Sequence, residues 1–339
     1  MITKIINFGV IGAGRIGKIH AENLATRISG ARLAGVADVN LAAAQDVAGQ
    51  FHVPLATADF HQMLAAPDIE AVAICTATDT HAEIIQAAAA RGKHIFCEKP
   101  IDLDLMRIQQ ALAAVSQAGV KFQVGFNRRF DPSFAKARAL VVAGKIGAPQ
   151  LVRITSRDPA PPPLAYVKVS GGIFLDMTIH DFDMVRFLSG SEAVEVFAIG
   201  AALVDPEIGR AGDVDTCVVT LRLENGALAT IDNSRRAVYG YDQRVEVFGA
   251  AGMVAVANRT PDNHVLLDAE SVSSAKPQYF FLERYQEAYV AELQQFIDCI
   301  HQDTTPSVGG KDGLMAVVLG LAAKKSLQEN RPVKVSEIF

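Results

Sequence analysis

The glycine motif near the start of the chain constrains the fold more than any other feature. It is Gly12-Ala13-Gly14-Arg15-Ile16-Gly17, and it follows an apolar run at 4–11 and opens a helical pattern at 15–25. In this setting G-x-G-x-x-G is typical of a dinucleotide-binding βαβ unit. The first glycine permits a tight turn, the second lets the backbone approach a pyrophosphate, and the third allows close helix–strand packing. The N-terminus of the helix then favours phosphate. The residues expected to contact the dinucleotide here are Gly12, Gly14, Arg15, Ile16 and Gly17.

An acidic residue stands where such a unit needs one. Asp38 lies near the end of the second expected strand, about 20 residues after Gly17. A carboxylate there can bind the adenosine ribose hydroxyls and repels a 2′-phosphate, and no arginine follows in Val39-Asn40-Leu41. The sequence therefore predicts NAD as cofactor in preference to NADP. The alternative is an ordinary glycine turn with a capping aspartate.

The first part of the chain, up to Phe126, alternates short apolar runs with alanine-rich helical runs. Strands are expected at 4–11, 32–39, 70–76, 93–97 and 120–126, and helices at 15–25, 40–49, 81–90 and 103–118. Near-continuous apolar strands that alternate with helices indicate a parallel sheet covered on both faces. We therefore expect an N-terminal Rossmann sheet.

After Phe126 strands follow one another, and Asn225-Gly226 between two of them is a strong hairpin signal. Strands are expected at 150–156, 193–204, 216–223, 227–233, 243–249 and 253–257, and helices at 138–144, 176–188, 283–300 and 313–327. The prediction is an α/β protein whose C-terminal α+β domain has a large, mainly antiparallel open sheet.

The predicted domains are an NAD-binding Rossmann domain at 1–126 and a substrate-binding and oligomerisation domain at 127–339. The last helix of the chain can pack back on the first domain. Because the outer face of the large sheet needs a partner, we expect a homo-oligomer.

Composition narrows the class of protein. The 339 residues carry a formal net charge of −5, so no basic nucleic-acid footprint is expected. The four cysteines show no C-x-x-C spacing, which favours reduced thiols without a disulfide or metal role. The longest uncharged apolar stretch near the C-terminus, 314–323, is too short to span a bilayer, and the N-terminus shows no signal-peptide pattern. We expect a cytoplasmic protein with no metal, membrane or nucleic-acid partner.

Polar residues follow the expected strand at 70–76, at the edge where ligands of open α/β sheets bind. Thr76, Ala77 and His81 are therefore cofactor candidates. For His81, a helix-start residue without a ligand is an equally good interpretation.

Glu98-Lys99-Pro100 follows the next expected strand at the same sheet edge. A lysine before proline is held extended rather than helical. Its ammonium group can donate to an alcohol oxygen and stabilise a developing alkoxide. The alternative is a solvated surface lysine, because the tripeptide alone is commonplace.

The stretch 171–183 is the most informative part of the second half. Asp176 and His180 are four residues apart and therefore neighbours on one helix face. A carboxylate orients an imidazole and stabilises its charged form, so the pair suits the removal of a hydroxyl proton. The alternatives are a helix-start aspartate paired with a surface histidine, and a less favoured metal site with Asp183.

Together these features resemble the Gfo/Idh/MocA family of NAD(P)-dependent oxidoreductases over essentially the whole chain. The resemblance is carried by the glycine loop, Glu98-Lys99-Pro100 and the Gly-Gly-x-x-x-Asp-x-x-x-His run at 171–180. Within the family, four segments are similar to inositol 2-dehydrogenases, at 125–131, 156–159, 239–244 and 281–285. The resemblance implies a catalytic triad of Lys99, Asp176 and His180, with His180 as proton acceptor. It also implies a Lys99–Pro100 bond that can be cis and tetramers packed through the second sheet.

The resemblance further implies which residues lie near a substrate. They are Lys99, Arg129, Asp158, Asp176, Met177 or its neighbour Thr178, His180, Tyr239, Tyr241 and Tyr285. Glu98 and Lys99 are also expected at the cofactor. Met177 stands where the family often has a polar residue, and Asp158 stands where some relatives have histidine. For Arg129 the alternative is a surface salt bridge, and for the tyrosines it is ordinary packing.

The resulting expectation is NAD-dependent oxidation of a ring hydroxyl of a cyclic polyol, with myo-inositol giving 2-keto-myo-inositol (scyllo-inosose). One alternative keeps the reaction but changes the substrate to scyllo-inositol, another inositol isomer or an aldose. A second alternative is a non-catalytic nicotinamide-binding regulator. Such a regulator would be free to lose Lys99, Asp176 and His180.

Overall fold

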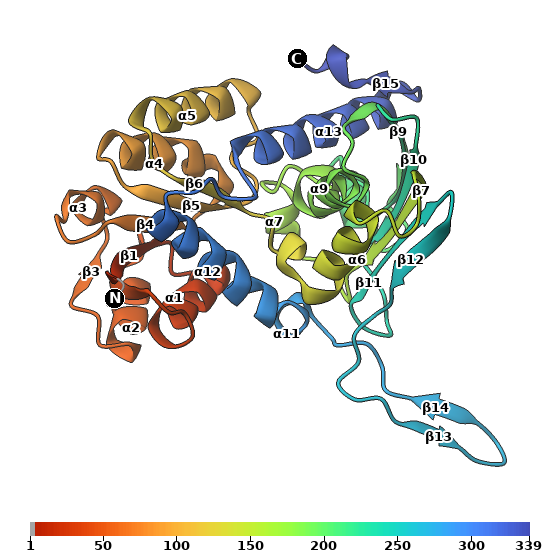
Figure 1. The fold of residues 1–339 in the computed structure, drawn as a ribbon, viewed down its shortest axis with the longest axis horizontal. Coiled ribbons are helices and arrows are strands. Elements are labelled where there is room, and N and C mark those ends of the chain that lie inside the picture. Colours follow the sequence, from red (N-terminus) through yellow and green to blue (C-terminus); the bar gives the residue numbers. More distant parts are fainter. Residues whose placement is uncertain (1–3) are drawn as a thin grey trace. The chain divides into compact units, whose positions relative to one another are not determined.

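Residues 4–339 are described by the computed structural model, and the chain forms two compact units (Figure 1). The first contains the chain up to Phe130 together with Glu287–Met315. The second contains Asp131–Gln286 and Ala316–Phe339. Glu287–Met315 thus joins the first unit although it follows most of the second along the chain. The functions assigned to 1–126 and 127–339 stay predictions.

The first unit is built on a six-stranded parallel sheet in the order β3-β2-β1-β4-β5-β6. Its strands are β1 (Ile6–Ile11), β2 (Ala31–Ala37), β3 (Leu55–Thr57), β4 (Ala71–Ile74), β5 (His94–Glu98) and β6 (Phe122–Gly125). The helices between them are α1 (Arg15–Thr26), α2 (Leu41–Gln50), α3 (Phe60–Ala65), α4 (Thr78–Ala90) and α5 (Leu105–Ala118). Every residue of β4 is buried, as the apolar runs predict for a sheet covered on both faces. The predicted Rossmann sheet is confirmed.

Helix α12 (Gln286–Gln302) completes the core of this unit. The ring of Phe296 lies 6.1 Å from that of Phe8 and 6.2 Å from that of Phe96, so the helix packs on β1 and β5. The sequence predicts one helix over 283–300. The structure instead has a short helix α11 (Phe281–Arg284) and then α12, because Tyr285 leaves the helical conformation where the chain passes between the units.

The second unit is built on a seven-stranded sheet in the order β12-β11-β7-β10-β9-β8-β15. Its strands are β7 (Pro149–Arg157), β8 (Ala193–Ala201), β9 (Thr216–Leu223), β10 (Leu228–Ser234), β11 (Asp242–Gly249), β12 (Gly252–Val256) and β15 (Val333–Lys334). The β7–β10 pair is parallel, and the other pairs described in this sheet are antiparallel. Gly226, at φ +86°, forms the turn between β9 and β10. The predicted mainly antiparallel sheet is confirmed.

The two faces of this sheet differ. Buried and exposed residues alternate along β9, as expected for a strand with one face on the core. Helix α9 (Thr178–Ser189) lies against β7 and β10 on the buried face, and α6 (Pro132–Val142) contacts α9 and β12. The opposite face exposes one large apolar side chain on each of five strands, namely Ile199, Val218, Leu228, Phe248 and Met253.

A buried polar contact ties α9 to the sheet. Asn233 on β10 accepts a hydrogen bond from the Thr178 hydroxyl at 2.6 Å and donates to the Asp181 carboxylate at 2.8 Å. All three side chains are buried, so losing either of these hydrogen bonds would be costly. This contact holds the start of α9 against β10.

The helix predicted over 176–188 is interrupted in the structure. It consists of α8 (Ile173–Asp176) and α9, separated at Met177. The Thr178 hydroxyl lies 3.3 Å from the carbonyl oxygen of Ile173, and side-chain hydroxyls that bond to nearby carbonyls compete with the regular helix pattern.

Several short elements have no counterpart in the sequence prediction. They are β3, α3, α7 (Leu164–Val167), α10 (Pro206–Arg210), the hairpin β13 (Val265–Leu267) and β14 (Val272–Ser274), and β15. Each is too short to show a periodic pattern of its own. The last helix, α13 (Gly310–Glu329), begins in the first unit and ends in the second. Across residues 4–339, none of the helices combines the length and apolar character that crossing a bilayer requires.

Candidate active site

The glycine loop between β1 and α1 is shaped by close backbone contacts. Gly12 has φ +101°, and a Cβ at this position would lie 2.5 Å from the carbonyl oxygen of Cys75. A Cβ on Gly17 would lie 1.8 Å from the carbonyl oxygen of Gly12. Above Gly14, by contrast, a Cβ would meet no atom within 4 Å. The first and third glycines therefore allow close packing, and the second leaves open space at the helix start.

Asp38 is held over this loop by backbone donors. One carboxylate oxygen accepts from the amide of Ala13 at 2.6 Å, and the other accepts from the amide of Asn40 at 2.8 Å. The carboxylate thus lies beside the turn that precedes α1. Arg15 is exposed and Ile16 half-buried in the first turn of that helix. The start of α1, the open backbone at Gly14 and the Asp38 carboxylate together fit a dinucleotide. Its pyrophosphate would contact the backbone amides at the start of the helix.

The residues after β4 form the next part of the sheet edge. Thr76 is half-buried, and its hydroxyl lies 2.7 Å from that of Thr80, while Ala77 is exposed. His81 is buried, with Nδ1 2.8 Å from the Pro100 carbonyl oxygen and Nε2 3.1 Å from the Thr76 carbonyl oxygen. Burial lowers the pKa of His81. His81 therefore links the ends of β4 and β5, and its predicted contact with a cofactor stays a prediction.

Glu98-Lys99-Pro100 lies at the end of β5, and the Lys99–Pro100 peptide bond is cis. This confirms the bond geometry that the resemblance implies. Lys99 is half-buried. The carboxylate of Glu98 points into the unit, where Oε1 lies 2.8 Å from Nε2 of His20. Glu98 was predicted at the cofactor, and that role stays a prediction.

Arg129 lies in the 3₁₀ turn η1 (Asn127–Phe130), directly after β6. Its guanidinium donates to Asp312 at the start of α13, with an N–O distance of 2.8 Å. Arg129 therefore forms a salt bridge, as in the alternative interpretation, but the pair is largely buried rather than on the surface, and the sequence did not indicate Asp312 as the partner. Its predicted contact with substrate stays a prediction.

In the second unit, Asp176 at the end of α8 has two partners that sequence reasoning missed. The Tyr166 hydroxyl donates to one carboxylate oxygen at 2.9 Å, and Arg235 donates to the other at 3.1 Å. The Arg235 side chain is only 1% exposed, so this is a nearly buried ion pair. The signal available in the sequence was the Arg235-Arg236 pair directly after the expected strand 227–233.

His180 lies in the first turn of α9 and is half-buried. Met177 is buried at the break between α8 and α9, and Thr178 is occupied by Asn233 of β10. The break means that Asp176 and His180 do not share one regular helix. Their predicted pairing stays a prediction.

Asp158 and Tyr239 lie where β7 and β10 end. The backbone of Asp158 bonds to Ser234 and Ala237, which joins the two loops. The Tyr239 hydroxyl donates to Asp242 at 2.5 Å and accepts from Arg157 at 3.3 Å. Partial burial and the neighbouring Asp242 carboxylate raise the pKa of Tyr239. Tyr239 is 38% exposed and is therefore accessible.

Tyr241 and Tyr285 pack on each other edge to face, with ring centroids 6.0 Å apart. Both are buried, at 6% and 2% exposure. The preceding residue, Arg284, stacks on the Tyr285 ring and forms an ion pair with Asp131. This is the packing that the sequence offered as the alternative to substrate contact, and their substrate role stays a prediction.

Two family profiles match the chain. An oxidoreductase family with an NAD-binding Rossmann fold matches residues 6–126, and the GFO/IDH/MocA C-terminal domain matches residues 134–255. The first match spans every strand of the parallel sheet, and the second spans most of the seven-stranded sheet but not β15.

Known proteins are similar to this chain over nearly its whole length. Myo-inositol 2-dehydrogenase of Thermotoga maritima is 51% identical, with 98% of this chain and 100% of the relative covered. Inositol 2-dehydrogenase of Rhizobium meliloti is 48% identical, with 98% and 99% covered. The crystal structure of scyllo-inositol dehydrogenase from Lactobacillus casei with bound NAD(H) and scyllo-inositol has a TM-score of 0.92, with 35% identity and 98% and 100% covered. The chain therefore belongs to the Gfo/Idh/MocA family of NAD-binding oxidoreductases.

Proposed function

We propose that the protein oxidises a ring hydroxyl of a cyclic polyol with NAD, and that it converts myo-inositol to 2-keto-myo-inositol (scyllo-inosose). The observation that carries the proposal is the 51% and 48% identity to two inositol 2-dehydrogenases, over 98% of this chain. At that similarity and coverage, both the cofactor half and the substrate half of the chain have counterparts in those enzymes.

The first unit holds the cofactor in this proposal. The open backbone above Gly14 and the amides at the start of α1 would bind the pyrophosphate, and Asp38 would bind the adenosine ribose. Thr76 and Ala77 extend this binding edge along the ends of the parallel strands. When bound, NAD supplies the nicotinamide carbon that accepts the hydride.

The protein's own residues manage the proton and the charge on oxygen. The neutral imidazole of His180 accepts the hydroxyl proton of the polyol. Asp176 stabilises the imidazolium that results, and its ion pair with Arg235 keeps the carboxylate oriented. Lys99 donates a hydrogen bond to the alcohol oxygen as that oxygen gains negative charge. The residues proposed to bind the polyol besides these are Arg129, Asp158, Met177, Tyr239, Tyr241 and Tyr285.

One alternative substrate has a specific observation in its favour. The similarity to a scyllo-inositol dehydrogenase at 35% identity makes scyllo-inositol the second candidate, ahead of other inositol isomers and aldoses. Because a polyol ring is recognised by only a few polar contacts, isomers that differ at one hydroxyl can be substrates of enzymes with the same fold. A nicotinamide-binding regulator without turnover is the remaining alternative.

A substrate panel tests the proposal directly. NADH formation is followed with myo-, scyllo- and chiro-inositol and glucose at equal concentrations. We expect the highest kcat/KM with myo-inositol. A higher value with scyllo-inositol or glucose would reassign the substrate, and cofactor binding without turnover on the whole panel would favour the regulator.

The assigned catalytic groups are tested by truncation. Lys99→Ala and His180→Ala should each lower kcat by about 10²–10⁴-fold, the usual scale for acid–base and electrostatic groups. Lys324→Ala and His264→Ala are matched controls, because both side chains are exposed and lie far along the chain from the residues assigned to cofactor and substrate. Turnover near that of the wild type in Lys99→Ala or His180→Ala would remove that residue from the mechanism.

The cofactor assignment predicts a measurable preference. The wild type should have a higher kcat/KM with NAD than with NADP, and Asp38→Ala should raise KM for NAD by roughly 10-fold, since hydrogen bonds to charged groups contribute about 1.5–3 kcal/mol. Asp46→Ala, on the exposed face of α2, is the control. A wild type that prefers NADP would contradict the role of Asp38.

We also propose that the protein forms homotetramers through the exposed face of the seven-stranded sheet and acts in the cytoplasm. The five exposed apolar side chains support the first point, and four free thiols support the second. Val218→Lys with Leu228→Lys should lower the molar mass measured by light scattering after gel filtration, whereas Val39→Lys in the first unit should not. A monomeric wild type would refute the assembly. Disulfide-linked cysteines in freshly extracted protein would argue against the compartment.

A further inference from the structure

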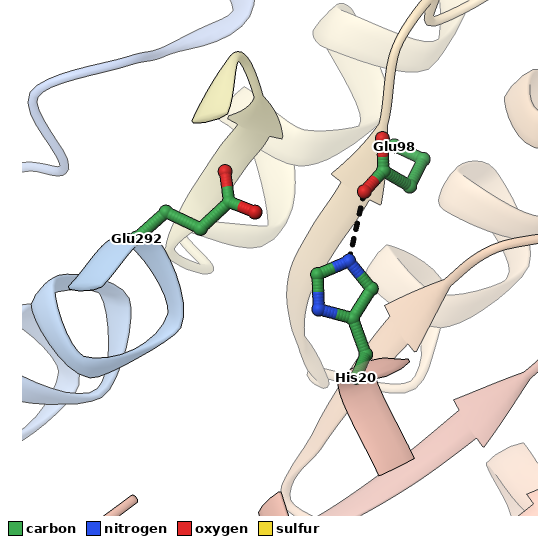
Figure 2. Close-up of side chains that lie close together, drawn as sticks. All are labelled: His20, Glu98 and Glu292. Atoms are coloured by element: carbon green, nitrogen blue, oxygen red, sulfur yellow. Dashed lines mark hydrogen bonds and ion pairs between the residues drawn. The ribbon is translucent and has the colours of Figure 1, made fainter. Parts of the chain in front are cut away.

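Three ionisable side chains from distant parts of the chain meet inside the first unit (Figure 2). His20 comes from α1, Glu98 from the end of β5 and Glu292 from α12. One nitrogen or oxygen atom from each lies within 4.8 Å of the others. The His20 side chain and Glu292 are 0% exposed, and the Glu98 side chain is 13% exposed. We call these residues the buried cluster.

The hydrogen bonds of the buried cluster define its donors. Nε2 of His20 lies 2.8 Å from Oε1 of Glu98, so a proton on Nε2 donates to the carboxylate. Within residues 4–339, neither Nδ1 of His20 nor either carboxyl oxygen of Glu292 has a hydrogen-bond partner. The Glu292 carboxyl group points toward the other two side chains (Figure 2), but its oxygens receive no hydrogen bond from them.

The charge of the buried cluster follows from its surroundings. Burial, and then the neighbouring Glu98 carboxylate, raise the pKa of Glu292 well above its usual range. Two cysteines face the same region, Cys75 after β4 and Cys97 in β5, and burial likewise raises their pKa values. From α12 the Tyr289 ring packs edge-on against His20 at 5.7 Å. Burial thus favours the neutral form of the Glu292 carboxyl group.

The remaining contacts restrict where Glu98 can lie. A Cβ on Gly125 of β6 would be 3.0 Å from its second carboxylate oxygen, so the carboxylate lies close to that strand. The backbone of Glu292 is held in turn by Gln123 of β6, which donates to its carbonyl oxygen at 2.8 Å. The carboxylate is therefore confined by His20 at one oxygen and β6 at the other.

We propose that the buried cluster positions Lys99: Nε2 of His20 holds the Glu98 carboxylate, Glu292 faces this pair from α12, and the cluster so fixes the residue that follows Glu98. This rests on the proposed role of Lys99 in oxidation. The other side of Lys99 is held in a similar way, since His81 contacts the Pro100 carbonyl oxygen at 2.8 Å. Lys99 thus lies between two residues that buried histidines contact, Glu98 through its side chain and Pro100 through its carbonyl oxygen. His20 and Glu292 act as positioning residues.

The test compares variants of the full chain that keep or remove the hydrogen-bond donor at position 20, which contacts the Glu98 carboxylate. His20→Leu removes it and should lower kcat with myo-inositol by about 10-fold or more while KM for NAD stays within about threefold, because displaced catalytic groups affect turnover steeply. His20→Gln offers an amide donor near the place of Nε2 and should recover most of kcat. Asn23→Leu, equally buried on the same helix, is the control and should leave kcat unchanged.

Glu292→Gln tests the protonation state. Because glutamine resembles the neutral acid, kcat should stay within about threefold of the wild type. The sign of the stability effect also follows. An acid whose pKa is raised in the folded state favours folding below the ordinary pKa, near 4.5, and that contribution is lost as pH rises through the folded value. The Tm of Glu292→Gln relative to wild type should therefore increase as the pH is raised above this range.

Two further measurements separate this proposal from its competitors. Hydrogen–deuterium exchange of the peptide spanning Glu98–Asp104 should be faster in His20→Leu than in wild type and His20→Gln. This readout needs no turnover, so it decides the positioning even if the wild type oxidises no polyol. Equal kcat and exchange in His20→Leu and His20→Gln would overturn the proposal, as would a collapse of kcat in Glu292→Gln. Stoichiometric divalent metal in purified protein, lost in Glu292→Gln, would overturn it in favour of a metal site.

Discussion

The close approach between the start of α1 and the ends of β1 and β4 is the constraint on which the cofactor half of the molecule depends. Gly17 lies so near the Gly12 carbonyl group that a single methyl group would overlap it, and a Cβ on Gly12 would lie 2.5 Å from the carbonyl oxygen of Cys75. This packing brings the amides of the helix start to the sheet edge and places the loop where Asp38 can accept a bond from Ala13. One steric condition thus shapes the proposed phosphate site and the proposed ribose site together.

Buried hydrogen bonds constrain the residues around the proposed catalytic groups. His81 contacts the Pro100 carbonyl oxygen on one side of Lys99, and His20 contacts the Glu98 carboxylate on the other. In the second unit, Asn233 fixes the start of α9, and Arg235 orients Asp176. None of these four groups is assigned a part in the reaction itself. They restrict the movement of the groups that are proposed to react with the substrate. Holding such groups in place before the reaction is how a protein preorganises charge at a reacting oxygen.

The sequence predicted those parts whose signal is local and repeated. The strands of the parallel sheet showed as apolar runs, the strands of the second sheet as a series ending in turn residues, and the glycine loop as a fixed spacing. It did not predict the break at Met177, beside which Thr178 bonds to Asn233 from another strand, or the break at Tyr285, whose ring packs on Tyr241. At both breaks the contacts are with residues more than 40 positions away along the chain.

The sequence by itself determined the fold class, the dinucleotide loop and the chemical types gathered in 98–100 and 171–180, because each is encoded in the spacing of neighbouring residues. The tertiary structure alone decided which partners these residues have. Arg129 meets Asp312, Asp176 meets Arg235, and Glu98 meets His20 beside Glu292. Such pairs join segments far apart in the chain, and no local pattern records a contact that exists only once the strands and helices have packed.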